Sequence, residues 1–209
     1  MELSLLVITI LSIVPAYVLG SVNGAIITSI SLYRKDIRKY GSGNPGLTNF
    51  YRVFGKGGAL LVIFIDVVKT LAPVLLGGYL FHRYYDMRLF GRELTGLFVL
   101  LGHCFPVFYR FKGGKGIMAA GTILIIIDWR IALICWGLFI IITALTKFVS
   151  LGSVIGVAAY PVFQIIFNLG EAKELIIAII SAALVIVRHQ ANIGRLIHGE
   201  ESKFSFKHD

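Results

Sequence analysis

Long apolar runs recur along the whole chain, and they constrain its fold more than any other feature. They indicate seven helices, at about 3–32, 57–81, 89–109, 116–128, 130–148, 150–169 and 174–189. Most runs approach the ~20 residues that cross a bilayer, and only 15% of the residues are charged. This pattern excludes a water-soluble domain. It predicts an all-α integral membrane protein, a compact bundle of seven transmembrane helices forming a single domain over residues 1–209.

The fourth apolar run is short, which leaves two interpretations open. The stretch "GIMAAGTILIII", which begins at Gly116, would rise only about 18 Å as a helix. It either crosses a thinned part of the bilayer or forms a re-entrant half-helix. In the second case the C-terminal segment would lie on the opposite side of the membrane from the polar segments that precede it.

The distribution of basic residues predicts the orientation. With seven crossings and the N-terminus outside, fourteen of the 20 Lys and Arg residues lie in inner loops and five in outer loops, with Lys69 inside a span. The positive-inside rule favours this arrangement, with the C-terminus in the cytoplasm. No basic leader follows Met1, so the first run is interpreted as a retained helix rather than a cleaved signal peptide. The net charge is +9, and the basic residues cluster in short loops beside the apolar runs. This distribution favours anionic ligands and not nucleic acid.

Three polar segments interrupt the apolar pattern, and the first covers residues 34–58. Its centre, "GSGNPGLTN" (41–49), combines hydroxyl, amide and glycine groups with few apolar ones. Gly, Ser and Asn permit left-handed turns in which successive N–H groups converge on an anion. Arg52 adds a planar guanidinium that suits phosphate. An ordinary solvated loop is the alternative interpretation.

The second polar segment is "YRFKGGKGIMAAG" (109–121). Three glycines let the backbone approach a ligand closely, and Lys112 and Lys115 supply charge. A glycine loop that leads into a helix N-terminus collects free N–H groups at the positive end of the helix dipole, which favours anion binding. The alternative is a basic loop with hinge glycines. The spacing differs from a Walker loop, so a nucleotide is not expected.

The third polar segment, "VRHQANIGRLIHGEESKF", covers residues 187–204. His189 and Asn192 are three positions apart, which places them on one face of a helix end. His189 could serve as a base, a hydrogen-bond donor or a phosphate partner. The alternative is an interfacial helix end whose cations extend towards the membrane surface.

Three further polar residues lie within or near the apolar runs. Asp66 and Lys69 are one helical turn apart inside the second run, so they are expected to neutralise each other in a structural role. His103 lies near the cytoplasmic end of the third run, where it could orient the glycine loop.

Other candidate groups are interpreted as structural. Ser150 and Ser153 begin the sixth helix, where capping is the expected use. Cys104 and Cys135 lie inside apolar runs and suggest neither a disulfide framework nor a metal site. No metal and no other cofactor is therefore expected.

Together the polar segments resemble the bacterial acyl-phosphate:glycerol-3-phosphate acyltransferase family, known as PlsY. The resemblance is carried by "GSGNPGLTNFYRVFGK" (41–56), "GHCFPVFYRFKGGKG" (102–116) and "RHQANIGRLIHGEE" (188–201), and more weakly by "SLGSV" (150–154) and "DVVKT" (66–70). It extends from about Gly20 to Glu201. The sequence departs from the family at Asn23, where proline is usual.

This resemblance implies a reaction and a location. An acyl group would pass from acyl phosphate to the 1-hydroxyl of glycerol 3-phosphate, giving lysophosphatidic acid and inorganic phosphate at the start of phospholipid synthesis. The partners would be these two substrates and membrane lipid, with no obligate protein partner. The protein would cross the bacterial cytoplasmic (inner) membrane several times, with the active site facing the cytoplasm.

The resemblance also implies the roles of individual residues. The catalytic set would be Ser42, Arg52, Lys115, His189 and Asn192. The substrate-binding set would be Asn44, Thr48, Asn49, Lys112, Gly113, Gly114, Gly116, Arg188 and Glu201. In this scheme the lysines and glycines hold phosphate, and Arg52 clamps the phosphate of glycerol 3-phosphate. His189 and Asn192 orient the glycerol, while Glu201 braces the third segment.

Two other functions are weighed against this enzyme. A membrane transporter for an organic phosphate also needs interrupted helices and buried charge, but no inverted repeat is evident and the polar segments lie on one face. A scaffold that binds anionic lipid through basic loops would not require the Gly/Ser/Asn/Thr cluster.

The chain also lacks the H-x-x-x-x-D pair of other glycerolipid acyltransferases, and the leaving phosphate itself could accept the hydroxyl proton.

Overall fold

The computed structural model describes residues 4–204, which form α-helices and two short 3-10 helices and contain no strand. The expected helix start at residue 3, the residues Met1 and Glu2, and Lys207 lie outside this range. The elements are α1 (Leu5–Gly20), α2 (Gly24–Tyr33), η1 (Ile37–Lys39), α3 (Leu47–Phe54), α4 (Ala59–Tyr85), α5 (Arg88–Cys104), η2 (Val107–Tyr109), α6 (Ile117–Ile127), α7 (Trp129–Thr146), α8 (Val149–Ile166), α9 (Ala172–Arg188) and α10 (Gln190–Ile197).

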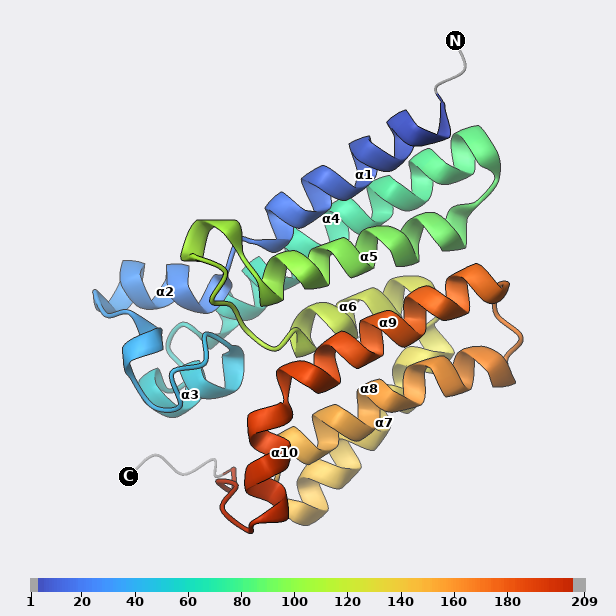
Figure 1. Ribbon diagram of the computed structural model, residues 1–209. Coiled ribbons are helices and arrows are strands. Elements are labelled where there is room, and N and C mark those ends of the chain that lie inside the picture. The colour runs from blue at the N-terminus through green and yellow to red at the C-terminus, as the bar shows by residue number, and fades with distance from the viewer. Residues whose placement is uncertain (1–3, 205–209) are drawn as a thin grey trace.

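The long helices run roughly alongside one another in two neighbouring groups (Figure 1). Helices α1, α4 and α5 pack together, and α6, α7, α8 and α9 form the second group. Contacts of α6 with α4 and α5, and of α9 with α5, join the two groups. The all-α prediction is therefore confirmed for the described residues.

Each of the seven predicted runs contains an apolar helix, but several ends differ from the prediction. The first run is broken after Gly20, and a new helix begins at Gly24. Asn23 caps this new helix, because its side chain accepts a hydrogen bond from the Ile26 N–H at 2.9 Å. The third helix ends at Cys104 rather than near residue 109, since Pro106 follows and disfavours helical geometry in the residue before it.

Helix length decides which elements are long enough to cross a membrane. Four stretches are long and apolar enough, and a fifth is if α9 and α10, which meet at 58°, form one broken span. The four are Leu5–Tyr33, Ala59–Tyr85, Trp129–Thr146 and Val149–Ile166. Helix α6 has only 11 residues and rises about 17 Å. The structure thus supports a membrane protein with several apolar helices, while seven crossings remain a prediction.

Apolar side chains divide between a packed interior and an exposed surface. Val99 and Leu100 of α5 and Ile123 of α6 belong to a buried cluster between the two helix groups. By contrast, Leu60 and Leu145 are each 80% exposed. Large apolar side chains exposed in such number, along several helices, fit a surface covered by lipid.

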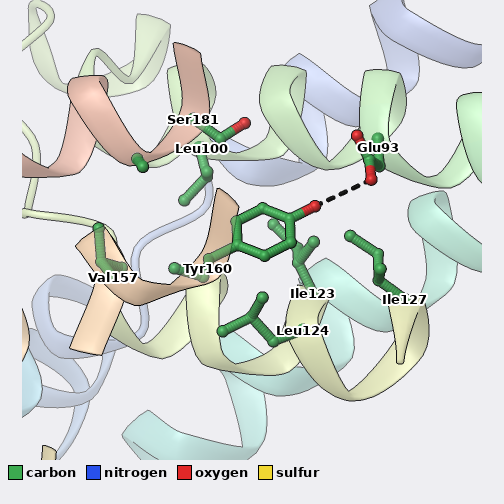
Figure 2. Close-up of a pocket in the computed structure, with 10 residues that line it drawn as sticks. Glu93, Leu100, Ile123, Leu124, Ile127, Val157, Tyr160 and Ser181 are labelled. Carbon is green, nitrogen blue, oxygen red and sulfur yellow. Dashed lines mark hydrogen bonds between the residues drawn. The ribbon is translucent and has the colours of Figure 1, made fainter. Parts of the chain in front are cut away.

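A buried polar cluster ties α5 to α8 within this interior. Glu93 Oε1 accepts hydrogen bonds from the Tyr160 hydroxyl at 3.0 Å and from Gln164 Nε2 at 2.9 Å. The contact with Tyr160 borders a small cavity of about 20 Å³ that is otherwise lined mainly by apolar side chains (Figure 2). The cluster lies away from the three polar segments, and its contacts indicate a structural tie between the helices.

The three polar segments lie at one end of the bundle (Figure 1). At that end α5 and α9 finish, and α4 and α6 begin, next to α2, α3 and α10. Although α6 is short, it leads away from this end and continues into α7 through Asp128, which caps α7. The fold therefore brings together residues that are up to about 150 positions apart in the sequence.

Candidate active site

The first polar segment folds into a tight loop that is closed by Asn49 at the start of α3. Gly41 and Gly43 have positive φ angles of 58° and 70°, as predicted for left-handed turns. The Asn49 side chain is buried, accepts from the Ser42 N–H at 2.9 Å and donates to the Tyr40 carbonyl at 3.0 Å. Asn49 therefore shapes the loop, and leaves the exposed Ser42 hydroxyl free of hydrogen bonds to other described residues.

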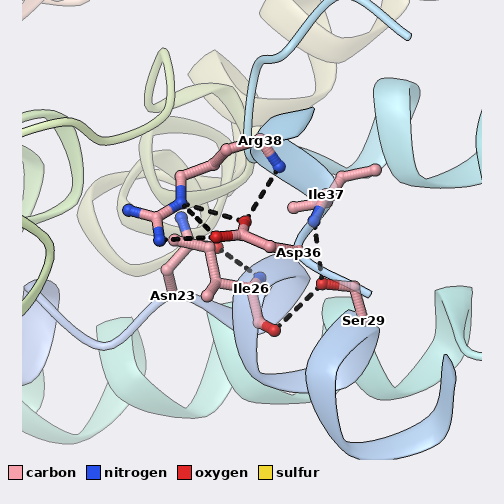
Figure 3. A network of polar contacts seen from close by, with 6 residues as sticks. All are labelled: Asn23, Ile26, Ser29, Asp36, Ile37 and Arg38. Carbon is pink, nitrogen blue, oxygen red and sulfur yellow. Dashed lines mark hydrogen bonds and ion pairs between the residues drawn. The ribbon is translucent and has the colours of Figure 1, made fainter. Parts of the chain in front are cut away.

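A network of polar contacts anchors the beginning of this loop to α2 (Figure 3). Ser29 accepts the Ile37 N–H at 3.2 Å, and Arg38 pairs with Asp36 at 2.7 Å. The Arg38 guanidinium lowers the pKa of Asp36 below its ordinary value. Asn23 Nδ2 adds a bond to the Pro45 carbonyl at 3.0 Å. The residue at which the sequence departs from the PlsY pattern thus links α2 to the first polar segment.

In the second segment, the glycine loop (residues 112–116) is held by the protein itself. Arg188 donates from Nη2 to the Gly113 carbonyl at 3.1 Å and from Nε to the Gly114 carbonyl at 3.2 Å. The Gly114 N–H donates to the His103 carbonyl at 3.1 Å. Arg188 therefore braces the loop, and its expected contact with substrate stays a prediction.

The geometry at Gly114 differs from the expectation that this glycine lets the backbone approach an anion closely. The Gly114 N–H is already hydrogen-bonded, and a Cβ at this position would collide with His103 Nε2 rather than with an anion beyond the loop. Gly116 has a φ of 87° and precedes α6 without a side-chain cap. The first N–H groups of α6 therefore have no carbonyl partner within the helix, which leaves them able to bind an anion.

The third polar segment is organised by Glu201. Its Oε1 accepts from Asn192 Nδ2 at 2.6 Å and from the Ser150 hydroxyl at 2.7 Å, and its Oε2 accepts from Arg195 Nε at 2.7 Å. Burial alone would raise the pKa of Glu201, but these hydrogen bonds bring it below its ordinary value. The expected brace is therefore present, and Ser150 belongs to it instead of capping α8.

His189 lies at the junction of α9 and α10 and is 2% exposed. Its Nδ1 is 2.8 Å from the Val185 carbonyl oxygen, which can only accept. The ring proton must therefore be on Nδ1, which leaves the Nε2 lone pair available. The structure records no hydrogen bond from Nε2 to a described residue.

Lys115 joins the second and third segments. Its Nζ donates to Asn192 Oδ1 at 2.5 Å, and Asn192 is in turn held by Glu201. Burial lowers the pKa of Lys115 to about 8; the carboxylate of Glu201 opposes this shift, whereas three nearby guanidinium groups add to it, those of Arg195, Arg188 and Arg52. This concentration of cations favours anion binding at this end of the bundle.

The first segment reaches the others through Arg52. Its guanidinium donates from Nη1 to the Ser202 hydroxyl at 3.4 Å and from Nη2 to the Ser202 carbonyl at 3.3 Å. Sequence reasoning missed Ser202, which carries no local signal beyond its place after Glu201. Side-chain hydrogen bonds to the other segments are absent, among the described residues, for Ser42, Asn44, Thr48 and Lys112.

The described residues of this region include no obvious set of metal ligands. No group of three or more His, Cys, Asp or Glu residues is arranged to hold a metal ion within residues 4–204. The arrangement instead provides backbone N–H groups, cations and amides around a polar surface. These groups can bind phosphate and stabilise negative charge that develops on it.

Comparisons with known proteins identify the family. Residues 10–199 match the family described as glycerol-3-phosphate acyltransferase. The glycerol-3-phosphate acyltransferases of Thermoanaerobacter pseudethanolicus and Finegoldia magna are 37% and 39% identical to the chain over 198 residues, covering 95% of it and 96% of each relative.

Solved structures give the same result. The crystal structure of PlsY (YgiH), an integral membrane glycerol 3-phosphate acyltransferase, in its glycerol 3-phosphate form has a TM-score of 0.84 and 33% identity over 94% of this chain and 96% of that chain. Its lysophosphatidic acid form has a TM-score of 0.82 and 31% identity over 95% and 96%. The chain belongs to the glycerol-3-phosphate acyltransferase family of integral membrane enzymes.

Proposed function

We propose that this acyltransferase takes its acyl group from an acyl phosphate. It transfers that group to the 1-hydroxyl of glycerol 3-phosphate and releases lysophosphatidic acid and inorganic phosphate, at the start of phospholipid synthesis. Both substrates carry a phosphate, and the site offers two cationic regions, one around Lys115 and the α6 N-terminus and one at Arg52. The similar PlsY structures with glycerol 3-phosphate and lysophosphatidic acid support this assignment.

The contact between Lys115 and Asn192 carries the proposal. It brings the cation of the glycine loop to the amide of the third segment, beside the first N–H groups of α6. A phosphate at this junction would receive both charge and directed hydrogen bonds. Arg52, with Asn44, Thr48 and Asn49 shaping its loop, would clamp the phosphate of glycerol 3-phosphate. Ser42 and Lys112 complete the polar rim.

The transfer step requires little base strength from the protein. The 1-hydroxyl oxygen attacks the acyl carbon, the bond from that carbon to the phosphate oxygen breaks, and the phosphate leaves with the electron pair. The leaving phosphate accepts the hydroxyl proton. Lys115 stabilises the leaving charge, while His189 and Asn192 orient the glycerol, so catalysis depends on positioning and electrostatics.

The site faces the cytoplasm of a bacterial cell, at the inner face of its cytoplasmic membrane, with the N-terminus outside. The three polar segments share one end of the bundle, and that end carries most of the basic residues. The exposed apolar side chains place lipid around the helices, and an acyl chain would reach the site from that lipid. No obligate protein partner is required.

The decisive experiment uses purified protein in detergent with glycerol 3-phosphate and one donor at a time. Acyl phosphate should yield lysophosphatidic acid and inorganic phosphate in equal amounts, whereas acyl-CoA should yield neither. Turnover with acyl-CoA but not with acyl phosphate would refute the donor assignment.

The reaction should also survive exhaustive chelation, and activity restored only by a divalent cation would refute metal-independent catalysis.

A further inference from the structure

Asp66 and Lys69 form an ion pair inside α4 that extends to a third residue. Lys69 Nζ lies 2.8 Å from Asp66 Oδ1, and the two side chains are 3% and 2% exposed. His103 of α5 approaches the same ammonium group, with Nδ1 at 2.9 Å from Nζ. The pair therefore does more than neutralise itself, because it contacts the helix that leads into the glycine loop.

The N–H donors of Lys69 determine which ring nitrogen of His103 carries the proton. An ammonium group has three N–H donors and no acceptor. Lys69 Nζ faces three acceptors, namely Asp66 Oδ1, the Val22 carbonyl at 2.5 Å and His103 Nδ1. Nδ1 must consequently be unprotonated, and the ring proton must be on Nε2. His189 has the opposite tautomer, since its Nδ1 donates to the Val185 carbonyl.

The protonated edge of His103 lies against the glycine loop. A Cβ at Gly114 would collide with His103 Nε2, and a Cβ at Gly113 would collide with the His103 carbonyl oxygen. That carbonyl accepts the Gly114 N–H at 3.1 Å. His103 thus touches the loop through both its backbone and its ring, immediately before Lys115.

We propose that Asp66, Lys69 and His103 act as one buried positioning unit for the reaction. Lys69 locks His103 in its Nε2–H tautomer, and the locked ring fixes the path of the chain at Gly114. This path sets where Lys115 and the N-terminus of α6 meet the phosphate. His103 acts through the loop and is a positioning residue. The inference rests on the proposed function of the glycine loop as a phosphate site.

Nitrogen NMR tests the first step without any acyl donor, so its failure is distinct from failure of the proposed function. In protein labelled with 15N-histidine, His103 should show a protonated Nε2 and an unprotonated Nδ1. His189 should show the reverse and serves as an internal reference. Substitution of each histidine by Asn assigns the signals. A wild-type His103 protonated on Nδ1 would overturn the proposal.

A paired substitution then tests the lock. Asp66→Asn combined with Lys69→Met removes both charges together, which avoids leaving one buried charge without a partner. The signals of His103 should lose their single-tautomer pattern, while those of His189 stay unchanged. An unaltered His103 tautomer in the folded double variant would contradict a lock by Lys69.

Kinetics tests the contact with the loop. His103→Asn places an amide oxygen near the former Nδ1, where it can still accept from Lys69, but leaves nothing against Gly114. We expect a near-normal melting temperature, a kcat reduced on the order of ten- to a hundredfold and a higher KM for acyl phosphate, with KM for glycerol 3-phosphate unchanged. A purely structural role would reduce the active fraction without changing either KM, and that result would refute the positioning role.

Discussion

Lys115 is the residue whose side chain joins the glycine loop to Asn192 of the third polar segment. Its ammonium is held by Asn192, which is itself held by Glu201. Lys115→Met should reduce kcat by roughly a hundred- to a thousandfold, because losing one preorganised electrostatic contact typically costs ~2.7–4 kcal/mol. Lys35→Met is the matched control, since Lys35 is exposed at the same end of the bundle and outside the site. Near-normal turnover of well-folded Lys115→Met at saturating substrate would refute the role of Lys115.

The pH dependence of turnover provides a second test at this residue. Burial, reinforced by neighbouring cations, lowers the pKa of Lys115 to about 8. The charged form exists below that pKa, so kcat should fall as the pH rises through about 8. Lys115→Arg keeps its charge at every accessible pH. Its residual activity should lack this alkaline decline, whereas an identical decline in the variant would show that another group titrates.

At the scale of elements, the Ser150 hydroxyl forms a clamp between α8 and Glu201 of the third polar segment. Ser150 donates to Glu201, while Ser153, one turn along the same helix, donates to the Val149 carbonyl of its own helix. Ser150→Ala should lower kcat/KM by about tenfold or more, because hydrogen bonds to charged groups contribute about 1.5–3 kcal/mol. Ser153→Ala should retain activity. Equal kinetics for the two variants would show that the clamp does not support the site.

The tie between α5 and α8 should affect stability instead of chemistry. Glu93→Ala would leave the buried donors of Tyr160 and Gln164 without their acceptor, at a cost of about 1–3 kcal/mol for each. Glu93→Gln keeps an oxygen that can accept both bonds and should be much milder. Thermal unfolding in detergent measures both variants. A melting temperature unchanged in Glu93→Ala would mean that the tie contributes nothing to stability.

At the scale of the whole molecule, seven crossings would place the two ends of the bundle on opposite sides of the membrane. Single cysteines at the exposed positions Lys56 and Lys203 report on the polar end, and one at Asp86 reports on the other end. A membrane-impermeant thiol reagent should label Asp86→Cys on intact cells and the other two only in inverted vesicles. Both native cysteines are buried, which limits background labelling. Labelling of either polar-end position from outside would overturn the orientation.

The sequence by itself determined the helical class, the approximate positions of the seven apolar helices and the three polar segments. These features depend on local patterns, because apolar run length predicts a membrane helix and a Gly-rich basic loop predicts an anion site. The same reasoning predicted left-handed turns within residues 41–49, and the structure has them at Gly41 and Gly43. Family resemblance added the expected roles, which local chemistry does not supply.

Only the tertiary structure decided which polar groups meet. Ser150 and Glu201 are 51 positions apart, and Arg52 and Ser202 are 150 apart, so no local pattern could pair them. The same holds for His103, whose tautomer follows from a lysine on a different helix. A hydrogen bond requires its two groups to come within about 3 Å, and that distance is set by how helices pack, which depends on side chains distributed along the whole chain.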